Sequence, residues 1–196
     1  VNPLAVESLF KYRFIYDPLS IYKNVYKLQP GHIINFTSEN VELKKWYNLN
    51  SFSNMDSNKD VIHKKLRNYF DEAVNRRLVS DVDLGVFLSG GLDSSLIVSS
   101  LAEQGYSLPC FTMGFEGAAD YYEERPQAKR LAKYFGMDHH SFEINEKSIL
   151  KKIPEIFNAS DEPFADTSAI PFYMLSSEVS SKVKVVLSGD GGDEVF

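Results

Sequence analysis

The chain has 196 residues, enough for one domain or for one domain and part of a second. Hydrophobic residues make up 43% and charged residues 24%, as in ordinary globular proteins, and the net charge of −6 argues against a nucleic-acid-binding surface. A single cysteine, Cys110, excludes a disulfide within the chain and favours a buried thiol in a reducing cytoplasm. We find no apolar run of membrane-spanning length, and we expect a cytoplasmic protein without a membrane partner.

The first 50 residues contain the signals of a small mixed unit. A proline near its start predicts a short helix over residues 3–10, and apolar runs at 32–36 and 41–43 flank a polar turn, which predicts a hairpin. His32 follows a Pro-Gly turn, where a structural hydrogen bond is a more frequent role for histidine than catalysis. The polar stretch 51–59 has the composition of a linker.

After residue 60, helical and strand patterns alternate. Apolar residues at helical spacing over 62–74, among them Leu66 and Tyr69, predict an amphipathic helix. Buried strands are expected over 84–88 and 108–115 and a third strand over 139–144, with helices between them. This alternation predicts an α/β fold with a doubly wound parallel sheet, in which ligands bind at the carboxyl ends of the strands.

Two adjacent histidines, His139 and His140, lie in the last of these predicted strands. Successive side chains of a strand point to opposite faces of the sheet. The pair is therefore not expected to bind one metal ion together.

A loop of small and polar residues, Ser-Gly-Gly-Leu-Asp-Ser-Ser at 89–95, joins the strand over 84–88 to the next helix. The free N–H groups and the positive dipole end of that helix favour an anion, most often phosphate. Gly90 and Gly91 permit a tight turn and the close approach of a ligand. The pattern matches neither the Walker loop nor the dinucleotide fingerprint, and a connection that binds nothing is the alternative. Hydroxyl donors and a carboxylate suited to Mg²⁺ are supplied by Ser89, Ser94, Ser95 and Asp93.

A second loop of the same character ends the sequence. It follows the apolar run 185–187 and reads Ser-Gly-Asp-Gly-Gly-Asp-Glu at 188–194. Two such loops at the ends of two parallel strands would meet at one edge of the sheet. We therefore expect one ligand site built from both loops.

The two loops, in this order, resemble those of the glutamine-dependent asparagine synthetase family, whose synthetase domain is an N-type ATP pyrophosphatase of the adenine nucleotide alpha hydrolase-like fold. The resemblance implies ATP and Mg²⁺ as cofactors, with aspartate and glutamine-derived ammonia as the other small-molecule substrates. In the implied reaction, the aspartate side-chain carboxylate is adenylated with release of pyrophosphate, and ammonia then displaces AMP to give asparagine.

The resemblance also implies roles for single residues. Asp190 and Asp193 would be catalytic, with Asp190 facing the acyl-adenylate, and Asp93 and Asp193 would hold Mg²⁺. An acidic residue before the helix that starts near Pro126 is also implied, without a choice among its candidates. Residues implied to bind ATP or its pyrophosphate are Leu88, Ser89, Gly90, Gly91, Asp93, Ser94, Ser95, Met113, Gly114, Ser188 and Gly189, and the acidic candidates are Asp120, Glu123 and Glu124.

Some alternatives stay open at this point. Many family members carry Glu at the position of Asp190, so the acceptor could instead be a sugar acid, a peptide or a β-lactam precursor. A non-catalytic ATP-binding module is a further alternative. The oligomeric state is also open, a homodimer being one arrangement.

The resemblance divides the chain at residue 50. Residues 1–50 correspond to the tail of a glutaminase domain of class II amidotransferases, and 51–196 to the first part of the synthetase domain. Because that glutaminase uses an N-terminal cysteine and this sequence begins with Val1, we expect a fragment that does not hydrolyse glutamine. Weak ATP binding and no amide synthesis are expected of these residues alone.

Overall fold

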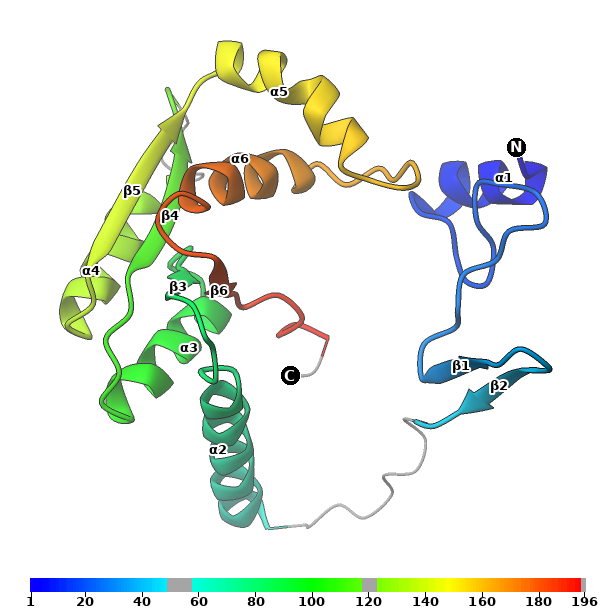
Figure 1. Ribbon diagram of the computed structural model, residues 1–196. Helices are drawn as coiled ribbons and strands as arrows, with labels where there is room; N and C mark the ends of the chain where they lie inside the picture. The colour runs from blue at the N-terminus through cyan, green and yellow to red at the C-terminus, as the bar shows by residue number, and fades with distance from the viewer. Residues whose placement is uncertain (49–57, 118–122, 195–196) are drawn as a thin grey trace. The chain divides into compact units, whose positions relative to one another are not determined.

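The computed structural model describes residues 1–48, 58–117 and 123–194 and consists of two compact units (Figure 1). The first unit comprises Val1–Asp56 with Glu155–Thr167, and the second comprises Ser57–Pro154 with Ser168–Phe196. Each unit is described by itself below.

The first unit contains the predicted helix and hairpin. Helix α1 (Pro3–Tyr12) begins after Asn2, whose side chain accepts a hydrogen bond from the Leu4 N–H at 3.2 Å. Strands β1 (His32–Phe36) and β2 (Val41–Lys45) pair antiparallel, which confirms the hairpin. The His32 ring lies 3.0 Å from the Pro30 carbonyl oxygen, as expected of a structural histidine in a turn.

A lysine joins three segments of the first unit. Nζ of Lys27 donates to the Ile15 carbonyl at 2.5 Å and to the Glu162 carboxylate at 2.7 Å, and lies 3.4 Å from the Asp17 carboxylate. Glu162 comes more than a hundred residues later in the chain, so this ion pair helps to hold the returning segment in the first unit.

The second unit is built on a four-stranded parallel sheet. Its strand order is β5-β4-β3-β6, and β3 pairs with both β4 and β6. The strands are β3 (Leu84–Phe87), β4 (Cys110–Phe115), β5 (His139–Ile144) and β6 (Val185–Leu187). The helices are α2 (Lys59–Arg76), α3 (Leu92–Glu103), α4 (Arg125–Tyr134), α5 (Glu146–Asn158), whose last four residues belong to the first unit, and α6 (Ala169–Val179).

Helices cover both faces of this sheet, as predicted. Val86 of β3 and Cys110 of β4 belong to the core shared with α2, α3 and α4. The residues that follow them, Phe87 and Phe111, point to the other face and pack with Val179 of α6. This alternation is the period of two expected of strands buried on both faces, and it confirms the doubly wound α/β fold.

Helix α2 is correctly predicted, but its apolar face is only partly buried. Val74 is buried and Phe70 packs against the core, whereas Leu66 is 43% and Tyr69 67% exposed. Polar contacts cover the middle of the helix: the Asp71 carboxylate accepts hydrogen bonds from Ser100 of α3 at 2.5 Å and from Arg67 at 2.9 Å. The apolar pattern therefore predicts the helix correctly, but fewer of its apolar residues are buried than the pattern indicates.

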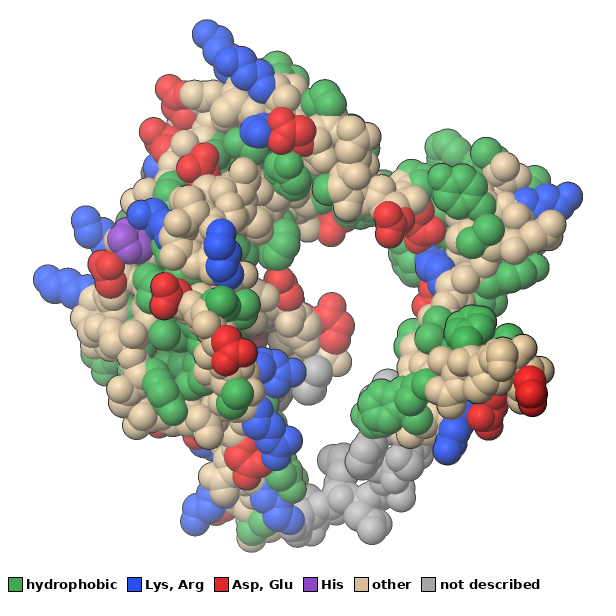
Figure 2. Space-filling view, viewed as in Figure 1, with side chains coloured by type: hydrophobic (Ala, Val, Ile, Leu, Met, Phe, Trp, Pro, Cys, Tyr) green, Lys and Arg blue, Asp and Glu red, His purple; other side chains and the backbone are tan. Residues whose placement is uncertain are grey.

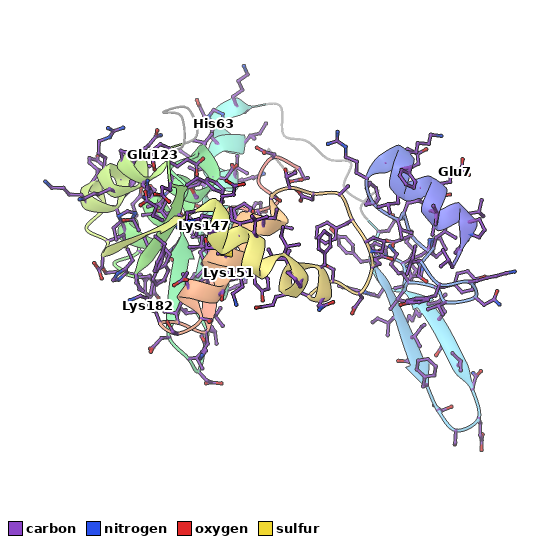
Figure 3. The ribbon with its side chains drawn as sticks, turned by 90° about the horizontal axis from the view of Figure 1, so that it is seen from above. Glu7, His63, Glu123, Lys147, Lys151 and Lys182 are labelled. Atoms are coloured by element: carbon purple, nitrogen blue, oxygen red, sulfur yellow. The ribbon has the colours of Figure 1, made fainter. Side chains whose placement is uncertain are left out.

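Helix α5 differs from the other helices of the described residues in that none of its residues is buried. Lys147 and Lys151 lie one turn apart on it (Figure 3). On the face of the molecule in Figure 2, cationic and anionic side chains are interspersed. Within the described ranges, none of the helices combines the length and apolar character needed to cross a bilayer.

The order of the strands creates a switch point at β3. The chain leaves β3 through α3 and continues to β4 on one side, and it returns through α6 to β6 on the other side. Since β3 and β6 are parallel neighbours, the loops that follow them emerge side by side. Such a position is where ligands bind in open α/β sheets.

Candidate functional site

The loop after β3 is held by its own hydroxyl groups. The Ser89 hydroxyl oxygen accepts a hydrogen bond from the Gly91 N–H at 3.2 Å and lies 3.0 Å from the hydroxyl of Ser94. The Ser95 hydroxyl donates to the Gly91 carbonyl at 2.5 Å. Gly91 is the N-cap residue of α3 and makes no side-chain capping bond, so the first N–H groups of the helix face the loop.

The loop after β6 lies directly against the start of α3. A Cβ added to Gly189 would be 2.8 Å from the Ser94 nitrogen, and one added to Gly192 would be 2.6 Å from Cγ of Asp93. Real Cβ atoms do not lie this close to other heavy atoms, so a side chain at position 189 would overlap the backbone of Ser94 and one at position 192 would overlap the side chain of Asp93. The two glycines are therefore what allows the second loop to approach the first.

Inside the second loop, one hydroxyl organises the turn. The Ser188 hydroxyl donates to the Asp190 carboxylate at 2.9 Å and accepts from the Asp190 N–H at 3.4 Å. Gly191 has φ +88°, a left-handed conformation that glycine adopts readily. The Gly192 N–H donates back to the Gly189 carbonyl at 3.2 Å, which closes the turn.

The two loops enclose a cavity of about 360 Å³, within the size range of small-ligand sites. Six of the residues predicted to bind ATP do not line the cavity. Leu88, Gly90, Ser95 and Ser188 belong to the two loops or directly precede them, and Met113 and Gly114 lie on β4. The residues that line it are Ser89, Gly91, Asp93, Ser94, Gly189, Asp190, Gly191, Gly192, Asp193 and Glu194.

Residues 65–196 match the Asn_synthase family, described as asparagine synthase. The chain belongs to this family. It is 40% identical over 200 residues to a putative glutamine-hydrolysing asparagine synthetase of Methanocaldococcus jannaschii, covering all of this chain and 38% of that protein. It is 33% identical over 196 residues to a glutamine-hydrolysing asparagine synthetase of Bacillus subtilis, covering all of this chain and 31% of that one. The chain thus spans less than two fifths of the length of these relatives.

Among solved structures, the chain is similar to the NMN synthetase of Francisella tularensis. The TM-score is 0.46 at 14% sequence identity, and the match covers 71% of this chain and 57% of that chain.

The carboxylate oxygens that line the cavity are ligands of the kind that a hard cation such as Mg²⁺ binds. Asp93 and Asp193 reach the cavity from opposite loops, and Mg²⁺ in phosphate sites is typically held by one or two protein carboxylates together with substrate oxygens. Within the described ranges there is no cluster of three or more His, Cys, Asp or Glu side chains suited to a metal ion. Four carboxylates line the cavity, those of Asp93, Asp190, Asp193 and Glu194, and Asp93 and Asp193 are the pair that we predict to hold the ion.

An arginine covers Gly114, where the family resemblance implies the nucleotide. A Cβ on Gly114 would lie 2.8 Å from Cδ of Arg125, so the glycine makes room for this side chain. Arg125 forms ion pairs with Glu123 and, at 3.0 Å, with Glu143. The contact of Gly114 with nucleotide stays a prediction.

The acidic residues before α4 differ in their surroundings. Hydrogen bonds from Arg125 hold the pKa of Glu123, which lies two residues before α4 (Figure 3), below its ordinary value. Burial, assisted by the neighbouring Glu123 carboxylate, raises the pKa of Glu124. Asp120, the third candidate, lies outside the described residues.

Sequence reasoning missed a buried polar connection to the first loop. The Thr112 hydroxyl of β4 donates to the Leu88 carbonyl, the residue just before the loop, and lies 3.0 Å from Nε2 of His139. Because the single hydroxyl proton is used on Leu88, the histidine nitrogen is the donor in its contact with Thr112. His140 stacks on Phe111 instead, so the two histidines occupy opposite faces as predicted.

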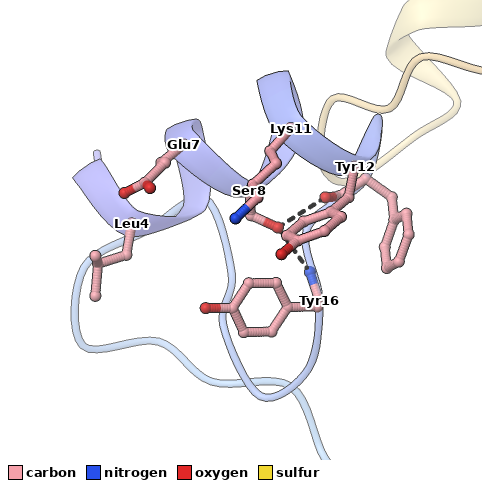
Figure 4. Close-up of a pocket in the computed structure, with 7 residues that line it drawn as sticks. Leu4, Glu7, Ser8, Lys11, Tyr12 and Tyr16 are labelled. Carbon is pink, nitrogen blue, oxygen red and sulfur yellow. Dashed lines mark hydrogen bonds between the residues drawn. The ribbon is translucent and has the colours of Figure 1, made fainter.

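The first unit has a hollow of its own, of about 490 Å³, beside α1 (Figure 4). Ser8 within it donates to the Phe14 carbonyl at 2.9 Å and accepts from the Tyr16 N–H at 3.3 Å. Its polar group is thus used in folding this segment. The hollow is lined by Leu4, Glu7, Ser8, Lys11, Tyr12, Phe14 and Tyr16.

Proposed function

We propose that this chain is part of a glutamine-hydrolysing asparagine synthetase and that its two loops bind the pyrophosphate end of ATP. The observation that carries the proposal is the position of Asp93 and Asp193, which face one cavity together with the first turn of α3. The names of the relatives, at 33–40% identity over the whole chain, favour aspartate as the acceptor over other carboxylates.

The proposed reaction has two steps. An oxygen of the aspartate side-chain carboxylate attacks the α-phosphorus of ATP, and pyrophosphate leaves as the bond between the α-phosphorus and its bridging oxygen breaks. Ammonia then attacks the acyl carbon, AMP leaves, and one proton is lost to give the amide of asparagine.

The chain contributes position and charge to the first step. The N–H groups at the start of α3 and the dipole of that helix stabilise the negative charge that develops on pyrophosphate. Asp93 and Asp193 would hold Mg²⁺, which neutralises phosphate charge when bound. Asp190, oriented by the Ser188 hydroxyl, lies in the wall of the same cavity and is our candidate for the side of the acyl-adenylate.

We assign residues 1–50 of the first unit to the end of a glutaminase domain, so that ammonia is supplied from glutamine by the whole protein. The assignment follows the family resemblance of residues 1–50 and keeps the synthetase domain as the remainder of the chain. A cytoplasmic location fits the single buried Cys110, and the substrates are small molecules rather than nucleic acid or membrane.

The test uses the purified product of the complete gene with Mg-ATP, aspartate and ammonium, followed by mass spectrometry. We expect AMP, pyrophosphate and asparagine in equal amounts. Asp193→Asn should lower the rate by at least about a hundredfold, whereas Asp81→Asn, on an exposed turn, should not change it. Formation of ADP, or of AMP without asparagine, would contradict the proposal.

A further inference from the structure

Gln127 connects α4 to the loop after β3, 37 residues earlier in the chain. Its Nε2 donates a hydrogen bond of 2.8 Å to the carbonyl oxygen of Gly90. Gln127 does not line the cavity and contacts the loop from outside. Gln127 is therefore connected to the cavity through its hydrogen bond to Gly90 of the loop.

Gln127 and α4 also fill the space that a side chain at position 90 would occupy. A Cβ on Gly90 would lie 3.1 Å from Cγ of Gln127 and 3.2 Å from the Ala128 nitrogen. Gly90 has φ +88°, and a glycine has many other backbone conformations available to it. The packing and the hydrogen bond together favour the backbone conformation of Gly90 seen here.

The peptide between Gly90 and Gly91 is fixed at both ends. Its carbonyl accepts from Gln127, and its N–H donates to the Ser89 hydroxyl oxygen at 3.2 Å. Because a peptide group is planar, fixing the carbonyl also fixes the direction of the N–H. The Ser89 hydroxyl that receives this N–H lines the cavity and lies 3.0 Å from the Ser94 hydroxyl.

We propose that Gln127 is a positioning residue that fixes the Gly90–Gly91 peptide and so aligns the loop for pyrophosphate. The use of the loop for pyrophosphate rests on the proposed function, whereas the fixing of the peptide does not. Without the amide donor, the Gly90 carbonyl loses its partner and the peptide is free to rotate.

The test compares Gln127→Met, which keeps the methylene stem and removes the donor, with Gln104→Met. Gln104 is a matched control near the other end of α3, where its Nε2 donates to the Ser100 hydroxyl at 3.0 Å. Two measurements are made on the product of the complete gene, unaltered and with each change: amide hydrogen exchange at residues 89–92 without ligand, and calorimetric binding of pyrophosphate, Mg-ATP and AMP.

We expect Gln127→Met to speed exchange at residues 89–92 and to weaken pyrophosphate and ATP binding, each by about tenfold. AMP has no β- or γ-phosphate and should lose less than about twofold, and the unfolding temperature should match that of Gln104→Met. Unchanged exchange at 89–92 would overturn the inference. So would equal weakening of all three ligands with a lowered unfolding temperature, which indicates a general structural role.

The experiment distinguishes failure of the proposed ATP site from failure of the proposed role of Gln127. If the unaltered chain binds neither pyrophosphate nor ATP but exchange at 89–92 still rises in Gln127→Met, the positioning of the peptide is supported and the ATP site is contradicted. If the unaltered chain binds both and Gln127→Met binds them equally well, the ATP site is supported and the role of Gln127 is overturned.

Discussion

Gly192 lies so close to Asp93 that a Cβ on the glycine would be 2.7 Å from Oδ1 of the carboxylate. The two residues are about a hundred positions apart and come from the two loops that follow β3 and β6. Their contact means that the two loops pack directly against each other. A change in either loop should therefore alter the site as a whole.

Gly189→Ala should disrupt the site by direct overlap. Its Cβ would lie 2.8 Å from the Ser94 nitrogen, so either α3 or the second loop must move, at a cost of about 1–3 kcal/mol. We expect ATP to raise the unfolding temperature of the unaltered chain but not of Gly189→Ala. Gly105→Ala is the control, because Gly105 has φ +81° with open space around it and lies away from the loops. It should lose about 1–2 kcal/mol and keep the effect of ATP. Equal stabilisation of Gly189→Ala by ATP would contradict the account.

Thr112→Val should destabilise the second unit by about 1–3 kcal/mol, because the buried Leu88 carbonyl loses its donor while the volume is preserved. Urea unfolding measures this loss. Ser80→Ala is the control, since the Ser80 hydroxyl also donates to a carbonyl, that of Val82, but at an exposed position. We expect it to cost less than about 0.5 kcal/mol. Equal costs for the two variants would show that burial of the Thr112 bond is unimportant.

His139 should make stability depend on pH near neutrality. Burial, with the positive charges of His140 and Lys129, lowers its pKa below 6.5, and Asp138 opposes the shift only weakly. The folded chain then binds fewer protons than the unfolded chain, so stability is complete above pH 6.5 and falls as the pH drops from there toward the lowered pKa.

His139→Asn should remove this component, which cannot exceed about 1.4 kcal/mol per pH unit. The measurement is the free energy of unfolding between pH 5 and 8. His63→Asn on α2 (Figure 3) replaces an exposed histidine in the same way and serves as the matched control. A pH profile of His139→Asn that coincides with that of the unaltered chain would refute the assignment.

Cys110 should be unreactive in the folded chain. Its side chain is 0% exposed, and burial, assisted by the Asp138 carboxylate, raises the pKa of the thiol to about 12. Since the thiolate is the reactive form, a disulfide reagent at pH 8 should label no thiol in the native chain and one per chain in denaturant. Rapid labelling without denaturant would show that β4 is not buried as described.

Local patterns predicted much of this architecture. Strands β3, β4 and β6 come from short apolar runs, and the helices α3 and α4 are followed by Gly105 and Gly136, which have a left-handed backbone with φ +81° and +70°. The two loops could be placed together because both follow parallel strands. Side-chain contacts between residues far apart in the chain could not be predicted from the sequence. Gln127 bonds to Gly90, 37 residues away, and Thr112 bonds to Leu88, 24 residues away.

The serines show a different limit of sequence reasoning. Ser94 and Ser95 are residue types that donate to phosphate, and this was the basis for their prediction. In the structure both hydroxyls donate to the Gly91 carbonyl, at 3.3 and 2.5 Å, because a hydroxyl in the first turn of a helix has that carbonyl within reach. Their direct contact with ATP remains a prediction.

The central claim is that the loops after β3 and β6 hold one pyrophosphate group, and backbone NMR of the chain tests it most directly. Addition of Mg-pyrophosphate should shift the amide signals of residues 90–94 and 189–193 together, with one common affinity, and leave the signals of the β1–β2 hairpin unchanged. Shifts in only one loop, in neither, or mainly in the first unit would contradict the account.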